Sequence, residues 1–298
     1  MDKYYNNYHA LKNISLNIKK GQIYCYLGPN GSGKTTTIKI ILGLLKTSSG
    51  SVEVLGEDPY IDNVKSLDVK RCIGSMLEWD GLYLNLTGLE NVIYWAELYG
   101  QDKFDARENA VDAIQKVKLL DWANTLVSKY SHGMKKRLSF VRAIINDPDI
   151  LVLDEPTSGI DLESRILIRD ALRNFVKRGK TVFFSSHDLE EVKKVSSSLS
   201  ILNKGKIIFN GSLDELIKTF GQNEVYIQMK NPDDAFSMIK KFENNVTSLK
   251  INGPIISFIP NPGYTPDLES KKIISSWNME ASIENAYINA ISSSGDKI

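Results

Sequence analysis

Cysteine is scarce in this sequence, and its scarcity restricts the chemistry of the protein. Cys25 and Cys72 are the only two among 298 residues, and both lie in apolar runs, "IYCYLG" and "RCIGSML". Two isolated thiols with apolar neighbours are typical of buried cysteines in a reducing compartment. The sequence therefore speaks against a disulfide framework and against a thiolate metal site.

A charge excess of one sign and long hydrophobic runs are also missing. Lysine and arginine total 37 against 36 aspartates and glutamates, so no global field attracts the chain to nucleic acid or to an acidic membrane. The most apolar stretch, residues 38–45, is interrupted by Lys39 and Gly43, whereas a bilayer span needs about 20 apolar residues. The opening "MDKYYNNYHALKN" lacks the order of a signal peptide. We expect a soluble protein that contacts a membrane only through a partner.

A glycine-rich segment follows the first apolar run. Residues 23–27 are strand-like, "GPNGSGKTT" follows, and helical periodicity resumes at Ile38. The spacing G-x-x-x-x-G-K-T predicts a loop whose backbone N–H groups surround phosphate oxygens at a helix N-terminus. Lys34 is expected to reach the β and γ phosphates, and Thr35 to offer its hydroxyl to Mg²⁺. The alternative is a chance glycine-rich turn. The candidate nucleotide-binding residues are Gly28, Pro29, Asn30, Gly31, Ser32, Gly33, Lys34, Thr35 and Thr36.

Two adjacent carboxylates follow a second apolar run. Residues 150–153 are apolar and lead directly into Asp154 and Glu155. Such a run suits a strand buried on both faces of a parallel sheet, whose end lies beside the phosphate loop. We expect Asp154 to hold Mg²⁺ and Glu155 to polarise the water that attacks the γ-phosphate. A solvent-exposed acidic turn is the alternative.

His187 follows a third strand-like run, residues 181–186. If this strand is parallel to the previous one, His187 lies at the same edge of the sheet and can hydrogen-bond the γ-phosphate. Taken alone, the residue could equally be an exposed or helix-capping histidine.

These residues together resemble the ATP-binding cassette (ABC) ATPases, the motor subunits of ABC transporters. The phosphate loop, "LVLDEP", "SGID" and His187 occur in the order and spacing of that family, and "YSHGMKK" resembles its signature motif. The resemblance covers residues 1–216. It implies an α/β, P-loop NTPase-type fold with a mainly parallel sheet, an antiparallel β subdomain and a helical subdomain at residues 84–147. It also implies the cofactors ATP and Mg²⁺, and catalytic roles for Lys34, Glu155 and His187.

The signature segment "YSHGMKKRL", taken alone, could be a solvated helix face. In the ABC family this turn closes over the γ-phosphate held by the loop of a second subunit, so the resemblance implies a homodimer in which one chain supplies two half-sites. The basic run 135–137 would raise the local positive potential. The nucleotide contacts implied on this side are Ser131, His132, Gly133, Met134 and Asp161.

The aromatic expected to stack on adenine is Tyr5, in "KYYNNY". The alternative for this segment is a disordered tail. The family normally begins with a strand ahead of the aromatic, yet only four residues precede Tyr5, so either that strand is missing or the start lies upstream.

Two further positions depart from the family pattern. Glu78 stands where the family usually has a glutamine that binds Mg²⁺, so it is a third candidate metal ligand. A carboxylate binds a hard cation more strongly than an amide does, but it adds repulsion near Glu155, and we expect retained ATPase activity with an altered Mg²⁺ dependence. His132 stands where the family often has glycine, and we expect it to be tolerated.

The helical segment is the expected contact of an integral membrane permease. "TGLE" at residues 87–90 predicts a capping box, and the resemblance implies a groove near residue 78 that receives a cytoplasmic helix of the permease. The neighbouring aromatic patch is either a hot spot for that helix or core packing. The patch consists of Trp79, Leu82, Tyr83 and Leu84.

The last part, residues 222–298, predicts a small α+β domain. The strands are expected at 224–229, 246–251 and 254–260, and the helices at 232–243, 268–277 and 283–292. The closing "ASIENAYINAI" resembles the tail of drug- and bacteriocin-type export ATPases with ABC-2 permeases. This domain either mediates a dimer contact, regulates, or serves only as structural support.

The sequence thus predicts an ATPase domain at 1–221 and an accessory domain at 222–298. The expected function is ATP hydrolysis that drives export through a permease, with the chain peripheral on the cytoplasmic face of the membrane. A chromosome-maintenance ATPase would instead have long heptad repeats between Lys34 and Ser131, and a regulatory cassette would lack Glu155 or His187. The cargo is not readable from this chain.

Overall fold

The computed structural model describes residues 1–298 except 62–63, 78–80, 262 and 295–298. The chain divides into two compact units, Met1–Ser212 and Leu213–Ile298. The division precedes the expected boundary at 221 because α8 (Leu213–Phe220) packs on α10 (Ile283–Ser293). None of the helices in the described ranges combines the length and the apolarity needed to cross a bilayer.

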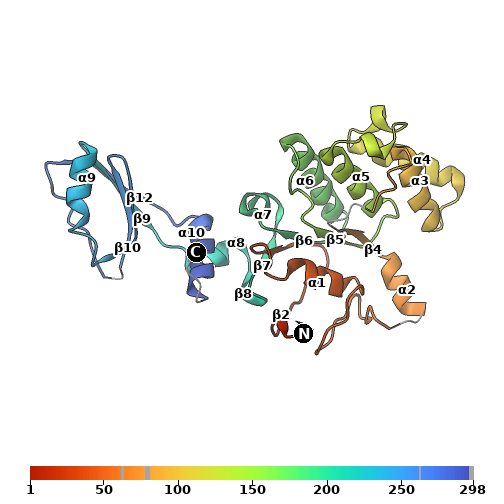
Figure 1. The fold of residues 1–298 in the computed structure, drawn as a ribbon, viewed down its shortest axis with the longest axis horizontal. Helices are drawn as coiled ribbons and strands as arrows, with labels where there is room; N and C mark the ends of the chain where they lie inside the picture. The colour runs from red at the N-terminus through yellow and green to blue at the C-terminus, as the bar shows by residue number, and fades with distance from the viewer. Residues whose placement is uncertain (62–63, 78–80, 262, 295–298) are drawn as a thin grey trace. The chain divides into compact units, whose positions relative to one another are not determined.

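A six-stranded sheet forms the centre of the first unit (Figure 1). Neighbouring strands are parallel except for the last one, which runs antiparallel to its neighbour. The apolar runs of the sequence are buried here because helices cover both faces of the sheet. This confirms the expected mainly parallel α/β fold. In spatial order the strands are β4 (Ile73–Met76), β5 (Ile150–Asp154), β6 (Thr181–Ser186), β3 (Ile23–Leu27), β7 (Ser198–Asn203) and β8 (Lys206–Gly211).

Helices lie on both faces of this sheet (Figure 1). On one face α1 and α2 pack over a core that contains Tyr26 and Phe183, whose rings are 5.6 Å apart. On the other face lie α5, α6 and α7. The helices are α1 (Lys34–Ile41), α2 (Val64–Arg71), α5 (His132–Ile144), α6 (Leu162–Lys177) and α7 (Leu189–Val195).

The antiparallel part is a hairpin at the start of the chain. Strand β1 (Lys3–Tyr5) pairs with β2 (Tyr8–Leu11), and Asn6 between them has a positive φ of 50°. Asparagine is one of the few residues that adopt this conformation readily, which suits a tight turn. The alternative of a disordered tail is therefore wrong, and Tyr5 itself lies in a strand.

The expected helical subdomain contains three helices and two short 3-10 turns. Thr87 caps α3 in a capping box: its hydroxyl accepts from the N–H of Glu90, and the Glu90 carboxylate accepts from the N–H of Thr87. This confirms the capping signal in "TGLE". The elements are α3 (Gly88–Leu98), α4 (Lys103–Lys116), η1 (Leu120–Trp122), η2 (Val127–Lys129) and α5.

The second unit contains an antiparallel sheet in the order β10-β11-β9-β12. The predicted helix at 268–277 is wrong: its second half belongs to strand β12 (Ile273–Met279). The strand β9 offers an open edge, and Trp277 stacks on Tyr226 of β9 with ring centroids 5.5 Å apart. Pairing with a distant strand therefore overrides the local pattern. The other elements are β9 (Glu224–Met229), α9 (Pro232–Ile239), β10 (Val246–Asn252) and β11 (Ile255–Pro260).

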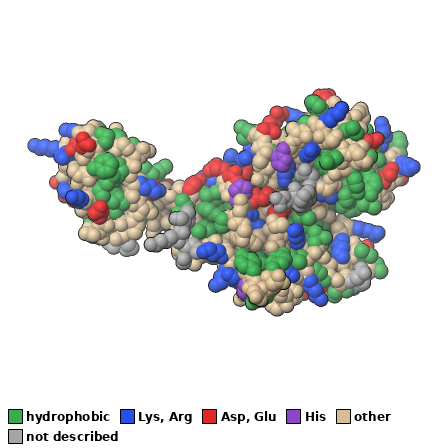
Figure 2. Space-filling model, in the orientation of Figure 1, with side chains coloured by type: hydrophobic (Ala, Val, Ile, Leu, Met, Phe, Trp, Pro, Cys, Tyr) green, Lys and Arg blue, Asp and Glu red, His purple; other side chains and the backbone are tan. Residues whose placement is uncertain are grey.

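Basic and acidic side chains are interspersed on the face of the molecule in Figure 2. This distribution agrees with the net charge of +1. Recognition by this protein must therefore depend on local groups and not on a long-range field.

Candidate active site

The glycine loop connects β3 to α1 and takes its shape from backbone conformations that glycine permits. Gly33 caps α1 with a φ of 112°, and a Cβ there would come within 2.6 Å of Leu11. A Cβ at Gly28 would collide with the carbonyl of Leu202. Side chains at either position would close the cradle or strain it. The conformation of the loop therefore depends on glycine at these two positions.

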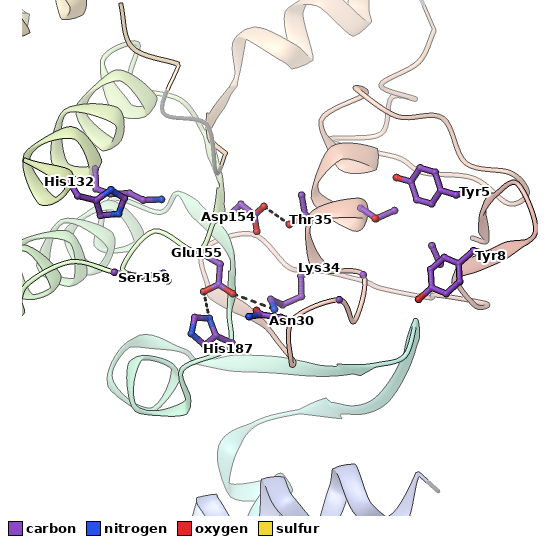
Figure 3. A pocket seen from close by; sticks show the side chains of 16 residues that line it. Tyr5, Tyr8, Asn30, Lys34, Thr35, His132, Asp154, Glu155, Ser158 and His187 are labelled. Carbon is purple, nitrogen blue, oxygen red and sulfur yellow. Dashed lines mark hydrogen bonds and ion pairs between the residues drawn. The ribbon is translucent and has the colours of Figure 1, made fainter. Parts of the chain in front are cut away.

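Lys34 is buried at the start of α1, and its ammonium group lies within the loop. Its Nζ donates to the carbonyl oxygens of Gly28 at 2.8 Å and Pro29 at 3.2 Å. It also lies 3.3 Å from Oε1 of Glu155 (Figure 3). That carboxylate oxygen has no hydrogen bond and depends on the ion pair alone. The sequence predicted both residues at the site, and the structure brings them together.

Thr35 and Asp154 form a pair of oxygen donors at the end of β5. The Thr35 hydroxyl donates to Oδ2 of Asp154 at 2.7 Å, and Ser185 donates to Oδ1 at 2.5 Å. Within the described residues there is no cluster of three histidine, cysteine or acidic side chains that could hold a metal by itself. A hydroxyl and one carboxylate are donors that suit Mg²⁺, which takes its remaining ligands from water and phosphate. Glu78, the third expected ligand, lies outside the described residues.

Glu155 is held in place through its backbone and both carboxylate oxygens. Its N–H donates to the Ser185 hydroxyl at 3.0 Å, which ties β5 to β6. Its Oε2 lies 2.9 Å from Nδ1 of His187, and its Oε1 faces Lys34 (Figure 3). The parallel pairing of β5 and β6 delivers His187 to this edge, as the sequence predicted.

A cavity of about 510 Å³ joins these residues to the hairpin and to α5. Figure 3 shows Tyr5 and Tyr8 at one end, His132 at the other, and Glu155 and Lys34 between them. The two tyrosines are exposed at the hairpin, where an aromatic face is open to a planar ligand. The lining comprises Tyr5, Tyr8, Ala10, Asn30, Gly31, Gly33, Lys34, Thr35, Thr36, His132, Lys136, Asp154, Glu155, Ser158, Gly159 and His187.

Ser131 caps α5 and lies on the surface, outside the lining of this cavity. Its hydroxyl oxygen accepts from the N–H of Met134 at 3.2 Å. Gly133 is buried against Asp161: a Cβ there would lie 2.8 Å from the Asp161 carboxylate. The signature turn is therefore packed against the "SGID" segment of its own chain. Lys34 and Ser131 do not line one cavity within a single chain.

Asp161 is the N-cap of α6, and its carboxylate accepts from the N–H of Ser164 at 2.9 Å and from the Ser164 hydroxyl at 2.8 Å. These hydrogen bonds, the backbone one first, hold the pKa of Asp161 below its ordinary value of 3.8. The carboxylate thus serves the helix and does not line the cavity.

Comparison with known proteins identifies the family. Residues 11–158 match the profile of the ABC transporter family. The bacitracin transport ATP-binding protein BcrA of Bacillus licheniformis is 37% identical over 241 residues, which are 80% of this chain and 76% of that protein. This chain belongs to the ABC transporter family.

Other relatives agree with this assignment. The ABC transporter ATP-binding protein NatA of Bacillus subtilis is 35% identical over 212 residues, which are 70% of this chain and 85% of NatA. Among solved structures, the dimeric ATP-binding cassette MJ0796 in a post-hydrolysis state with ADP and Pi is 28% identical, with a TM-score of 0.66 over 71% of this chain and 95% of that one. The protein is an ATP-binding, ATP-hydrolysing ABC subunit.

The structure adds residues to the site that the sequence did not single out. Tyr8, Gly159 and Lys136 line the cavity of the cassette, and Ser185 positions both acidic residues. Tyr8 was present in the "KYYNNY" cluster, and Gly159 in "SGID". The orientation of Lys136 had no signal in the sequence, because all three cations of 135–137 look alike there.

Proposed function

We propose that two copies of this cassette enclose two Mg-ATP, and that hydrolysis separates them and drives a membrane permease. The observation that carries the proposal is the Glu155 carboxylate, held between Lys34 at 3.3 Å and His187 at 2.9 Å beside the Thr35–Asp154 pair. A base, a phosphate-binding cation and a pair of Mg²⁺ ligands at one edge are the parts that phosphoryl transfer to water requires.

Each side chain has a distinct role in this proposal. Lys34 neutralises charge on the β and γ phosphates, and Glu155 orients the attacking water and accepts its proton. His187 is fixed by its Nδ1 bond to Glu155, which directs Nε2, on the opposite edge of the ring, to the γ-phosphate. Thr35 and Asp154 would hold Mg²⁺, with Glu78 as a further ligand, and the ion would neutralise phosphate charge.

The second copy supplies the signature side of the sandwich. Ser131 is exposed and its hydroxyl hydrogen can still donate, while its oxygen caps α5. The helix N-terminus at residues 131–134 adds positive potential for an anion, and Asp161 holds the adjoining segment. Tyr5 stacks on the adenine. The similar MJ0796 cassette is described as dimeric, which supports a homodimer here.

The permease partner and the direction of transport rest on the relatives. Similar proteins include the bacitracin transport ATP-binding protein BcrA and the Nod factor export ATP-binding protein I of Burkholderia orbicola. We infer export through a separate integral membrane subunit, with this chain bound at its cytoplasmic face. The membrane is contacted through that subunit, and no nucleic acid takes part.

Glu155→Gln tests the proposal because it removes the base and keeps the shape of the side chain. With saturating Mg-ATP the variant is expected to lose about 10²-fold or more in turnover and to elute as a dimer in size exclusion. Glu163→Gln is the matched control, since Glu163 is exposed and its ion pair is with the equally exposed Lys118. A Glu155→Gln chain that stays monomeric at saturating ATP would refute the sandwich.

A further inference from the structure

Lys136 is a buried cation without a partner. The residue is 5% exposed, yet in the described part of the chain it makes no hydrogen bond and no ion pair. It lines the same cavity as the phosphate loop. Lys34, the other lysine of that cavity, is bonded to two carbonyls and paired with Glu155.

The neighbours of Lys136 in the basic run have different surroundings. Lys135 is partly exposed, and Arg137 donates to the carbonyl oxygen of Val117 at 3.0 Å, at the end of α4. Lys136 instead lies one turn after His132, and both line the cavity. Residues four apart share one face of a helix, so this face of α5 presents a cation to the cavity near the positive end of the helix.

Neither of the two acidic side chains that line the cavity in the described part of the chain pairs with Lys136. Asp154 accepts from Thr35 and Ser185, and Glu155 is held by Lys34 and His187. The Lys136 ammonium group is not sealed from solvent, because it lines the cavity, so an anionic ligand that enters there can take the place of its water.

We propose that Lys136 forms a phosphate subsite in the cavity of its own chain. The ligand is a phosphoryl oxyanion, supplied either by the γ-phosphate of bound ATP or by the inorganic phosphate that hydrolysis releases. This rests on the proposed function, since it takes the cavity as the nucleotide site. It differs from the signature contact at Ser131, which lies outside this cavity.

Binding measurements on the full chain test the subsite without requiring turnover, and the arms with ADP and inorganic phosphate do not require dimerisation either. Isothermal titration calorimetry with Mg²⁺ present would measure three affinities. They are the affinity for ADP, the affinity of the ADP complex for inorganic phosphate, and the affinity of the Glu155→Gln chain for ATP. Lys136→Met is expected to leave ADP affinity unchanged. If the ligand is free phosphate, the variant should weaken phosphate binding to the ADP complex at least tenfold. If the ligand is the γ-phosphate, it should weaken ATP binding at least tenfold instead.

Two further variants separate binding from structural damage. Lys136→Arg keeps the charge and should retain the parent affinities, and Lys129→Met removes an exposed lysine ahead of α5 and should change nothing. Without ligand, Lys136→Met should melt no lower than the parent, because it replaces an unpaired buried charge with an apolar side chain of similar length.

The subsite is overturned if Lys136→Met leaves ADP, ATP and phosphate binding unchanged, or weakens all three equally. A lower melting temperature together with unchanged binding would assign Lys136 to packing alone. Failure of the proposed motor has a different signature: normal binding of ADP and phosphate by a chain that never dimerises with ATP.

Discussion

At the residue scale, the backbone of Glu155 carries strain that serves its position. Its φ of 49° is in the left-handed region, which costs a non-glycine residue of order 1–3 kcal/mol. The parallel strands β5 and β6 compensate for this strain by fixing the N–H of Glu155 on Ser185. The carboxylate is thereby directed at Lys34 and His187.

Glu78→Gln tests whether the unusual carboxylate contributes to Mg²⁺ binding. Loss of one charged oxygen ligand is expected to raise the Mg²⁺ concentration for half-maximal ATPase activity by about tenfold, because a carboxylate binds a hard cation more strongly than an amide. Activity at saturating Mg²⁺ should be retained. Glu97→Gln, on the exposed face of α3, is the control. An unmoved titration curve for Glu78→Gln would place that residue away from the metal.

At the scale of single elements, the start of α6 is stabilised by the carboxylate of Asp161, its N-cap residue. Asp161 satisfies the N–H of Ser164, one of the orphan donors at a helix N-terminus, and Gly133 packs against it. The signature turn and the start of α6 are therefore one packed unit. A change at Asp161 acts on the shape of that unit as well as on any nucleotide.

We expect Asp161→Ala to lower the stability of the protein in a pH-dependent way. The folded pKa of Asp161 lies below 3.8, so its contribution is complete above that value and disappears as pH falls through the folded pKa. Thermal unfolding should show a lower Tm for the variant at neutral pH, with a gap that narrows as the pH falls below 3.8. Asp161→Asn, which keeps a capping oxygen, should show a smaller gap. A gap that does not narrow as the pH falls from neutral to well below 3.8 would contradict the capping role.

At the scale of the whole molecule, the helical subdomain presents an aromatic surface. Tyr83 and Tyr94 meet edge to face at 5.0 Å and remain 42% exposed each, and Leu84 is exposed beside Tyr83. Core packing therefore does not account for Tyr83 or Leu84. Trp79, part of the same predicted patch, lies outside the described residues. An exposed aromatic group of this kind fits a partner helix.

Tyr83→Ala tests this surface as the permease contact. Capture of the cognate permease in detergent is expected to weaken by about tenfold or more, as for an aromatic anchor at an interface. ATP binding should be unaffected, because Tyr83 is not among the residues that line the nucleotide cavity. Phe236→Ala, which removes an even more exposed aromatic side chain in the second unit, is the control. If both variants capture the permease equally well, Tyr83 is not part of the interface.

Much of the first unit was predictable because its signals are local. Apolar runs predicted the buried parallel strands, and the glycine spacing predicted the phosphate loop, since both depend on properties of neighbouring residues. The second unit was less predictable: residues 273–279 form a strand only because β9 leaves an edge to pair with. The domain division likewise depends on the packing of α8 against α10, which are far apart in the sequence.

The sequence by itself determined the order of the motifs and the chemical type of each group: a glycine loop, a lysine, two carboxylates and a histidine. These follow from residue identity and short-range spacing. The tertiary structure alone decided which groups meet. It placed His187 on Glu155, used Asp161 to cap a helix, and turned Lys136 but not Arg137 into the cavity. Such choices depend on strand pairing and helix orientation, which bring together side chains that no local pattern relates.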